Sequence, residues 1–413
     1  MRKFIVIVVV ALVVLFGMWA YIYKTNKIIE SYEKQENKES KKELISMMLE
    51  TESGSGKYQE TTANEWPTEG YVFNETLSKC EQGSTLSWDS TKNTVVMMGN
   101  NSDRCYVYFD KAPDTVKLSD YIINLYTTQG ANNLYLHDST LTNGAGDGSY
   151  RYAGSSETTK NFVCFGYDSK DGSCPTDYLY RIIGVFNNQV KLIKYDYVKS
   201  TLLGTDGSYY DTYLSREFGG TNKGSNTTTE IGVYHWYKTS STNVWSESKL
   251  NTVNLNTNYM NNIGTKWSNK IAMHTWKAGG NTPSNILYSD TAQNIYNNEI
   301  TSPAVDTAYD AKVGLMYASD YGYAATPSAW NTNLYSYNSS SITNVNWMYM
   351  GLFEWSITRR SDNYERAFYV EYNGRVNHNF VSGGYAVRPV FYLTSEIMYV
   401  SGSGTISSPI LIN

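Results

Sequence analysis

The sequence predicts an α+β protein that begins with an apolar segment, and three observations lead to this prediction. Residues 4–23 form an uncharged apolar run, and no second run of this kind follows. β-prone runs separated by short polar turns recur along the chain, most clearly around Asn373-Gly374, which is typical of a two-residue type I′ hairpin. Ser246 to Ile263 and Asp290 to Ile300 have helical spacing and begin at N-cap residues. Helices mixed with antiparallel hairpins indicate an α+β fold.

The run from Phe4 to Tyr23 has the length of a membrane span, because twenty helical residues cover the roughly 30 Å hydrocarbon core of a bilayer. A cleaved secretory signal has a shorter apolar core and a small-x-small cleavage site, and neither is found here. Trp19 and Tyr21 are suited to the headgroup region. We therefore expect residues 1–23 to be an uncleaved signal-anchor that places the protein in the membrane.

The orientation of this anchor does not follow from its flanking charge. Lysines follow the apolar run as well as precede it, and large domains are translocated largely regardless of such charges. Four cysteines favour an oxidising exterior. We expect a single-pass protein of the cell membrane with an extracellular domain. An apolar helix followed by a polar stalk resembles type IV pilins, but Lys3 precedes Phe4 and Val8 replaces the family's Glu, so a pilin-like component remains only an alternative.

The composition argues for recognition and against nucleic-acid binding. The formal net charge is −5, which provides no basic surface for a nucleic acid. Tyr occurs 38 times and Phe 12 times, and only 18% of the residues are charged. Tyr and Asn supply rigid contact area and adaptable hydrogen bonds, which is the chemistry of binding surfaces. Codon usage of an AT-rich genome would produce the same bias.

The four cysteines predict disulfides. Their order favours two local bridges, Cys80–Cys105 and Cys164–Cys174, although four cysteines allow three connectivities. The alternative is a zinc site, which normally uses closely spaced Cys pairs. No such pair is present, so we expect no metal.

Changes in composition divide the chain into segments. Residues 24–50 alternate Lys and Glu and predict a helical stalk, and residues 51–69 form a Ser/Gly/Thr/Glu-rich linker. A small β-rich domain is expected over 70–149 and a larger α+β domain over 150–413.

The expected elements follow in chain order. β-prone runs at 94–98 and 105–109 surround a polar turn, and 118–126 has helical spacing. Within the larger domain the expected elements are a hairpin over 178–195 around Asn187-Asn188, the two helices named above, a short strand at 313–317, the hairpin over 367–381 and a last strand at 387–393.

Three motifs near the end of the chain recur together in a known fold. Glu354-Trp-Ser-Ile-Thr-Arg-Arg360, the hairpin around Asn373-Gly374, and Val387-Arg-Pro389 follow one another in this order. The block resembles the C-terminal core of the C-type-lectin-like fold in formylglycine-generating, or sulfatase-modifying, enzymes. The resemblance implies a lectin-like fold over 150–413 with 178–195 as its opening strands. The whole layout is similar to anchored surface proteins of low-GC Gram-positive bacteria.

The enzymatic activity of that family does not carry over. Formylglycine generation uses a late cysteine pair, and no cysteine follows Cys174. His235, His274 and His378 lack metal-ligand spacing, so each is interpreted as a structural residue. His378 is expected to face Tyr369 across its hairpin.

Other site motifs are also missing. No nucleophile elbow or zinc-protease motif occurs, and the loop from Asp168 to Gly172 lacks the alternating acidic pattern of a calcium loop. Arg388 before Pro389 is interpreted as a structural ion-pair partner. We expect no catalytic residue and no cofactor.

Ligand binding remains as the expected class of function, and one group of Trp, Tyr and Arg residues is a candidate binding site. Trp and Arg are enriched at binding hot spots, although Trp in this fold also packs in the core. The sequence predicts a non-enzymatic, membrane-anchored extracellular protein that binds a glycan, peptide or surface protein. A cell-wall-directed enzyme with an unrecognised site is the other alternative. The candidate binding residues are Trp347, Tyr349, Trp355, Arg359 and Arg360.

Overall fold

A computed structural model places the chain in two compact units, unit 1 (Met1–Thr115) and unit 2 (Val116–Asn413). The expected domain boundary at 149/150 differs from this division. The reason is strand pairing, because β9 (Leu134–His137) and β10 (Ser149–Tyr152) extend the sheet that contains β12 (Leu179–Phe186). The structure describes residues 15, 17–28, 45–63, 65–67, 70–89, 92–111, 116–130, 132–169, 173–214, 230–239, 242–282, 290–303 and 307–413.

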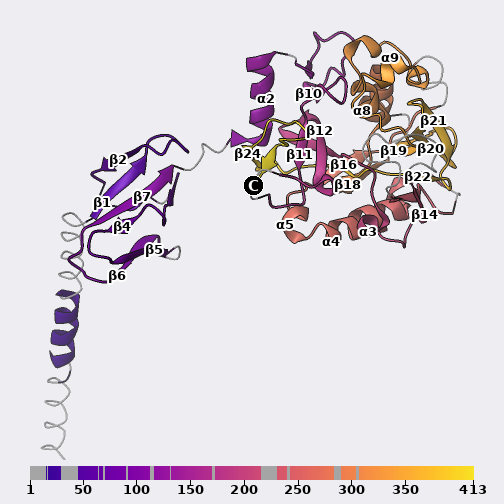
Figure 1. Cartoon of the computed structure of the whole chain (residues 1–413). Helices are drawn as coiled ribbons and strands as arrows, with labels where there is room; N and C mark the ends of the chain where they lie inside the picture. The colour runs from indigo at the N-terminus through magenta and orange to yellow at the C-terminus, as the bar shows by residue number, and fades with distance from the viewer. Residues whose placement is uncertain are drawn as a thin grey trace, which may run out of the picture. The chain divides into compact units, whose positions relative to one another are not determined.

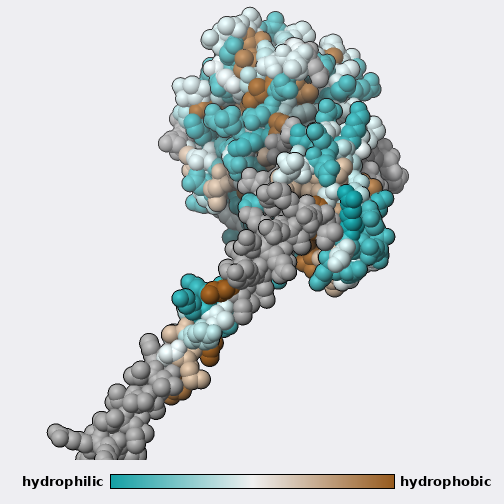
Figure 2. Space-filling model, turned by 90° about the vertical axis from the view of Figure 1, so that its left-hand side faces the viewer, coloured by the Kyte–Doolittle hydropathy of each residue, from teal (hydrophilic) through white to brown (hydrophobic). Residues whose placement is uncertain are grey.

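The N-terminal segment is helical over residues 17–28. Apolar side chains are exposed along it, as its brown surface shows (Figure 2), and Trp19 is 61% exposed. Within the ranges given above, no helix combines the length and the apolar character needed to cross a bilayer. Residues 4–14 and 16 of the predicted anchor lie outside the described residues.

Unit 1 is a small β structure built on a parallel pair of strands. Its main sheet has the order β2-β1-β7-β3, with β4 also paired to β7 (Figure 1). β1 and β7 run parallel in register from Ile45↔Cys105 to Leu49↔Phe109. β5 and β6 form a separate hairpin. The strands are β1 (Ile45–Glu50), β2 (Tyr58–Thr61), β3 (Tyr71–Phe73), β4 (Lys79–Cys80), β5 (Thr85–Asp89), β6 (Thr94–Met98) and β7 (Cys105–Lys111).

One expectation for this region is wrong. The predicted stalk over 24–50 ends in strand β1 rather than in helix, because Met47 packs into the core of unit 1 beside Val107 and Phe109. Residues 29–44 of that stalk lie outside the described residues. The runs 94–98 and 105–109 are strands, as predicted, and they belong to different sheets.

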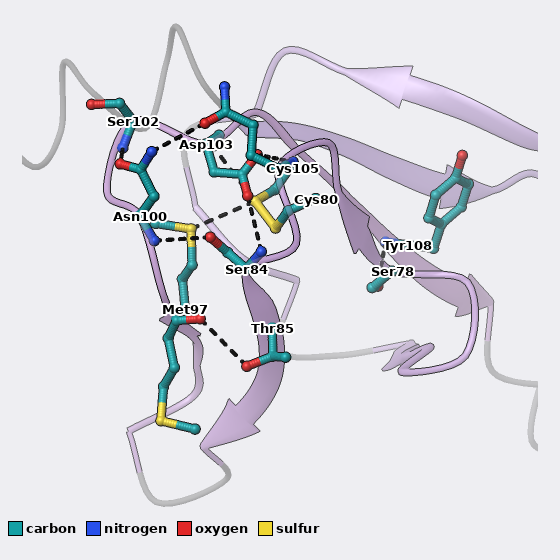
Figure 3. The surroundings of a disulfide bond; sticks show 12 residues. Ser78, Cys80, Ser84, Thr85, Met97, Asn100, Ser102, Asp103, Cys105 and Tyr108 are labelled. Carbon is teal, nitrogen blue, oxygen red and sulfur yellow. Dashed lines mark hydrogen bonds between the residues drawn. A yellow bond between two sulfur atoms is a disulfide. The ribbon is translucent and has the colours of Figure 1, made fainter.

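The polar segment between β6 and β7 explains why they do not pair. The buried Asp103 carboxylate accepts hydrogen bonds from the backbone N–H groups of Gln82 (2.7 Å) and Ser84 (3.0 Å), as Figure 3 shows in part. The segment is thereby attached to the β4–β5 connection. The Cys80–Cys105 disulfide lies beside it and joins directly paired residues of β4 and β7 (Figure 3). The second predicted bridge, Cys164–Cys174, is also present, so both pairings are confirmed.

Unit 2 contains a larger antiparallel sheet and a mixed sheet, in which β19 and β22 run parallel, with helices around them, which confirms the α+β class (Figure 1). The seven-stranded sheet has the order β18-β23-β13-β12-β10-β9 with β11 on β12, and the six-stranded sheet has the order β14-β15-β22-β19-β20-β21. The remaining strands are β8 (Val116–Lys117), β11 (Phe162–Cys164), β13 (Gln189–Lys194), β14 (Tyr209–Leu214), β15 (Glu230–His235), β16 (His274–Lys277), β17 (Ala308–Ala311), β18 (Val313–Gly314), β19 (Glu354–Arg359), β20 (Arg366–Val370), β21 (Val376–Phe380), β22 (Gly384–Ala386), β23 (Val390–Tyr392), β24 (Met398–Ser401) and β25 (Leu411–Ile412).

The helices of unit 2 are short apart from the first. The predicted helix over 246–263 is a 3₁₀ turn followed by a π-helical segment and an α turn, and the one over 290–300 is an α-helix that continues as a π-helix. The described helices of unit 2 are α2 (Leu118–Gln129), η1 (Thr176–Tyr178), α3 (Ser200–Leu203), η3 (Trp245–Glu247), η4 (Leu250–Tyr259), α4 (Met260–Asn262), α5 (Thr265–Ser268), α7 (Ala292–Tyr296), η5 (Asn297–Thr301), α8 (Ala318–Tyr323), η6 (Pro327–Ala329), η7 (Leu334–Ser336) and α9 (Ser340–Thr343).

The two predicted hairpins are present, but only the first has the predicted turn. Asn187 (φ 48°) and Asn188 (φ 62°) form the two-residue turn between β12 and β13. Between β20 and β21 only Gly374 has a positive φ, of 94°, and the loop is one residue longer. His378 therefore faces Phe368 rather than Tyr369.

The core of unit 2 includes a buried ion pair that was predicted from Arg388. The guanidinium donates to both carboxylate oxygens of Glu354, at 2.8 and 2.9 Å, and both side chains are almost fully buried. Arg388 also donates to the carbonyl of Met348 at 2.9 Å. This pair joins β19 to the segment that precedes β23, and the structural interpretation of Arg388 is confirmed.

Candidate functional site

Two of the five residues predicted to bind a ligand lie in the core. Trp347 and Trp355 are 0% exposed. Their indole N–H groups donate to the carbonyls of Tyr152 and Tyr234, each at 2.8 Å. Buried indoles with satisfied hydrogen bonds stabilise the fold and present no surface to a ligand.

The other three predicted residues do not form a common surface. Arg359 is 8% exposed and donates to Asn243 at 3.3 Å. Arg360 forms a two-pronged ion pair with Asp362 at 2.8 and 2.9 Å. Tyr349 is half-buried and lines an open cavity of about 760 Å³ in unit 2, which we call the Tyr349 cleft. The cleft is lined by Ser155, Ser156, Glu157, Thr159, Lys160, Phe162, Tyr195, Thr343, Asn344, Asn346, Tyr349, Thr405 and Ile406.

The three histidines considered in the sequence analysis separate into two structural residues and one that lines a pocket. His235 is bonded through Nδ1 to the carbonyl of Ser382 at 2.5 Å, and His378 lies between Arg360 and Arg366. His274 instead faces a second cavity. Across the described parts of the chain, no three His, Cys, Asp or Glu side chains are grouped as metal ligands.

The second cavity, which we call the Lys191 pocket, collects charged and aromatic side chains from both halves of unit 2. Its volume is about 260 Å³. Small-molecule sites of roughly 300–1,000 Å³ accept drug-sized ligands, so this pocket suits a single ring. It is lined by Asp147, Ser149, Arg151, Phe186, Asn187, Gln189, Lys191, His274, Thr275, Lys277, Tyr296, Ile300, Tyr317, Ser319, Asp320 and Tyr392.

A buried ion pair forms part of the wall of this pocket. Lys191 Nζ donates to Asp320 Oδ2 at 2.6 Å, and the two side chains are 1% and 2% exposed. Aromatic rings surround the ammonium, with the centroid of Tyr317 at 4.8 Å and that of Tyr392 at 5.3 Å. Burial lowers the pKa of Lys191, and the charge of Asp320 opposes this shift. Asp320 also accepts from the backbone N–H of Tyr317 at 2.9 Å.

A second ion pair in the pocket lining joins Arg151 of β10 to Asp147, which precedes that strand. Arg151 donates to Asp147 at 2.5 Å and to the Ser149 hydroxyl at 2.8 Å. Burial raises the pKa of Asp147, but the Arg151 charge and hydrogen bonds from Ser149 and Tyr296 outweigh it and lower that pKa to about 2. Each buried cation of the pocket therefore has its own carboxylate.

His274 completes the polar lining without adding charge. Its ring stacks on Tyr392 with centroids 3.9 Å apart and planes inclined by 25°. Burial, together with the nearby Lys191 charge, lowers the pKa of His274 to about 4. The imidazole is neutral at pH 7 and offers one donor and one acceptor.

Glu299 lies behind this lining and is not free to act on a ligand. Its carboxylate accepts from the backbone N–H groups of Ala318 (3.1 Å) and Ser319 (3.2 Å) and from the Thr358 hydroxyl. Burial raises the pKa of Glu299 to about 7 in spite of these bonds. A raised carboxyl pKa is typical of a general acid, but here both oxygens serve to position α8.

Comparison with known proteins adds no family to this geometry. No protein-family model, curated protein or solved structure matches the chain.

Sequence reasoning missed the Lys191 pocket because its residues are distant in the chain. The lining comes from β10, the β12–β13 hairpin, β16, the α7–η5 helices, the start of α8, and β23. One local signal existed, namely a lysine inside the otherwise apolar run Val190-Lys-Leu-Ile193. A charged residue in a buried strand requires a partner, which predicts a site or an ion pair.

Proposed function

We propose that this chain is a membrane-anchored surface protein that binds a neutral glycan through the Lys191 pocket of unit 2. The apolar run at 4–23 supports an anchor, and two disulfides support an extracellular position. The motifs around Trp355, Asn373-Gly374 and Arg388 support a C-type-lectin-like fold over residues 150–413, by resemblance. The proposal is of a binding protein rather than an enzyme.

The observation that carries the proposal is the charge balance of the Lys191 pocket. Arg151 is paired with Asp147, Lys191 is paired with Asp320, and His274 is neutral. A charged ligand would have to compete with one of these buried pairs, which is costly. A neutral ligand would leave both ion pairs intact.

The shape and lining favour a sugar ring among neutral ligands. Tyr317, Tyr392 and Tyr296 supply aromatic lining for the C–H groups of a pyranose, and paired charged groups can bond its hydroxyls without giving up their partners. Exposed residues at the rim, such as Thr275 and Lys277, leave room for the rest of a glycan. A terminal sugar residue fits this arrangement.

The test is titration of the full-length protein in detergent with neutral oligosaccharides selected from a glycan array. His274→Phe keeps the stacking on Tyr392 and removes the ring nitrogens, so affinity should fall about three- to tenfold. His378→Phe is the matched control outside the pocket and should leave affinity unchanged. Equal binding by both variants, or no retained neutral glycan, would overturn the proposal, and release of a cleaved sugar would favour the cell-wall enzyme.

A further inference from the structure

The Tyr349 cleft differs from the Lys191 pocket in its charge. Beneath its lining lies Arg181, a guanidinium that is 1% exposed. Arg151, Lys191 and Arg388 are equally buried, and each is paired with a carboxylate. Among the residues that the structure describes, Arg181 has no carboxylate partner.

Neutral groups alone hold this buried cation. Arg181 donates to Asn161 Oδ1 at 2.6 Å, to the Ser156 hydroxyl at 2.7 Å and to the Thr159 carbonyl at 3.0 Å. Its guanidinium carbon lies over the ring of Phe162, 4.3 Å from the centroid, and over that of Trp347 at 4.8 Å. Burial lowers the pKa of Arg181 to about 9, so the group remains charged at pH 7. A desolvated cation without a counterion is energetically costly unless an anion comes near.

Ser156 connects this cation to the cleft. Its hydroxyl oxygen accepts from Arg181, and Ser156 is an exposed residue of the cleft lining. Because the oxygen is occupied as an acceptor, the hydroxyl proton is free to be donated outward. A donor polarised by a guanidinium is suited to an anionic acceptor.

The remaining lining is that of a carbohydrate site. Hydroxyl and amide side chains predominate, and the aromatic residues are Phe162, Tyr195 and Tyr349. The Tyr195 hydroxyl bonds to no described residue, which leaves it available to a ligand. Two charged residues occupy the exposed lining, Lys160 and Glu157, and they offset one another. The positive charge beneath the cleft is therefore that of Arg181.

We propose that the Tyr349 cleft is a second binding site, specific for an acidic saccharide whose carboxylate accepts a hydrogen bond from Ser156 in front of Arg181. One hydroxyl donor and one cation match a singly charged carboxylate. A volume of about 760 Å³ holds several linked sugar rings rather than one. This site is independent of the Lys191 pocket and would stand if the proposed neutral-glycan site did not.

The experiment is calorimetric titration of the full-length protein in detergent with an oligogalacturonate and with its methyl ester. The two probes share rings and length and differ in the charge of the carboxyl groups. We expect the acid to bind at least tenfold more tightly than the ester, with an advantage that weakens at high salt. Equal binding of acid and ester, or no binding of the acid, would overturn the proposal.

Variants locate the site and separate it from the Lys191 pocket. Ser156→Ala leaves Arg181 in place and removes the outward donor together with one acceptor of the guanidinium, so acid binding should fall about tenfold while ester binding changes little. His274→Phe should leave acid binding unchanged. An unchanged acid affinity in Ser156→Ala would contradict the proposed contact. Equally tight binding of an oligoglutamate peptide would contradict the saccharide assignment.

Discussion

The Cys80–Cys105 disulfide should decide whether unit 1 is folded. Its sequence separation of 25 corresponds to a loop-closure contribution of about 3.5 kcal/mol in the chain-entropy model. The core of unit 1 is small, with Met47, Leu86, Cys105, Val107 and Phe109 as its buried residues. The total free energy of unfolding of a unit of this size is only about 3–5 kcal/mol, with the contribution of the disulfide included. Replacing both cysteines by serine should therefore bring the free energy of unfolding of unit 1 close to zero.

Unit 2 provides the matched control. Its Cys164–Cys174 bridge has a separation of 10, which corresponds to about 2.8 kcal/mol, but its core contains many more buried residues. Hydrogen exchange of the full-length protein, followed by mass spectrometry, reports the two units separately. Cys80→Ser/Cys105→Ser should remove protection over residues 45–111 only, and Cys164→Ser/Cys174→Ser should leave both units protected. Retained protection over 45–111 in the first variant would refute the reasoning.

Two further predictions concern the charged residues of unit 2. Lys191→Met leaves the buried Asp320 without its cationic partner and should cost about 3–5 kcal/mol in urea unfolding, whereas Lys191→Met with Asp320→Leu should recover most of that loss. Equal costs for the single and double variants would contradict the pairing argument. The pKa of His274 is about 4 when folded and 6.5 when unfolded, so its contribution to stability is present above pH 6.5 and is lost as the pH falls towards 4. Relative to His274→Phe, the wild-type protein should lose about 2–3 kcal/mol between pH 7 and pH 4, and parallel stability curves for the two proteins would argue against a neutral imidazole.

Local signals predicted local structure well. The Asn187-Asn188 turn and both disulfides follow from residue type and spacing, and the structure contains them as expected. The Asn373-Gly374 turn was predicted one residue too short, because Asn373 keeps a negative φ and only Gly374 takes the left-handed conformation. A dipeptide preference does not decide between a two-residue and a three-residue loop.

The pairing of strands that are distant in the chain could not be predicted from the sequence. Residues 45–50 have no local feature that overrides the helical charge pattern before them, and they form a strand because β7 is available as a partner. Trp347 and Trp355 have the composition of a binding site but lie in the core. The Lys191 pocket shows the opposite error. Its charged residues are of types that a sequence pattern assigns to the surface, but they are buried.

The parallel pairing of β1 and β7 has a mechanical consequence. The chain enters the sheet of unit 1 at β1 and leaves it after β7, so a pull on the two ends draws these neighbouring strands in opposite directions along their length. The hydrogen bonds between Ile45↔Cys105 and Leu49↔Phe109 are then loaded together in shear, rather than opened one at a time as in a peeled hairpin. Unit 1 should therefore resist force better than its small core suggests. Single-molecule stretching would detect this as a high rupture force, and a low-force, stepwise opening would contradict it.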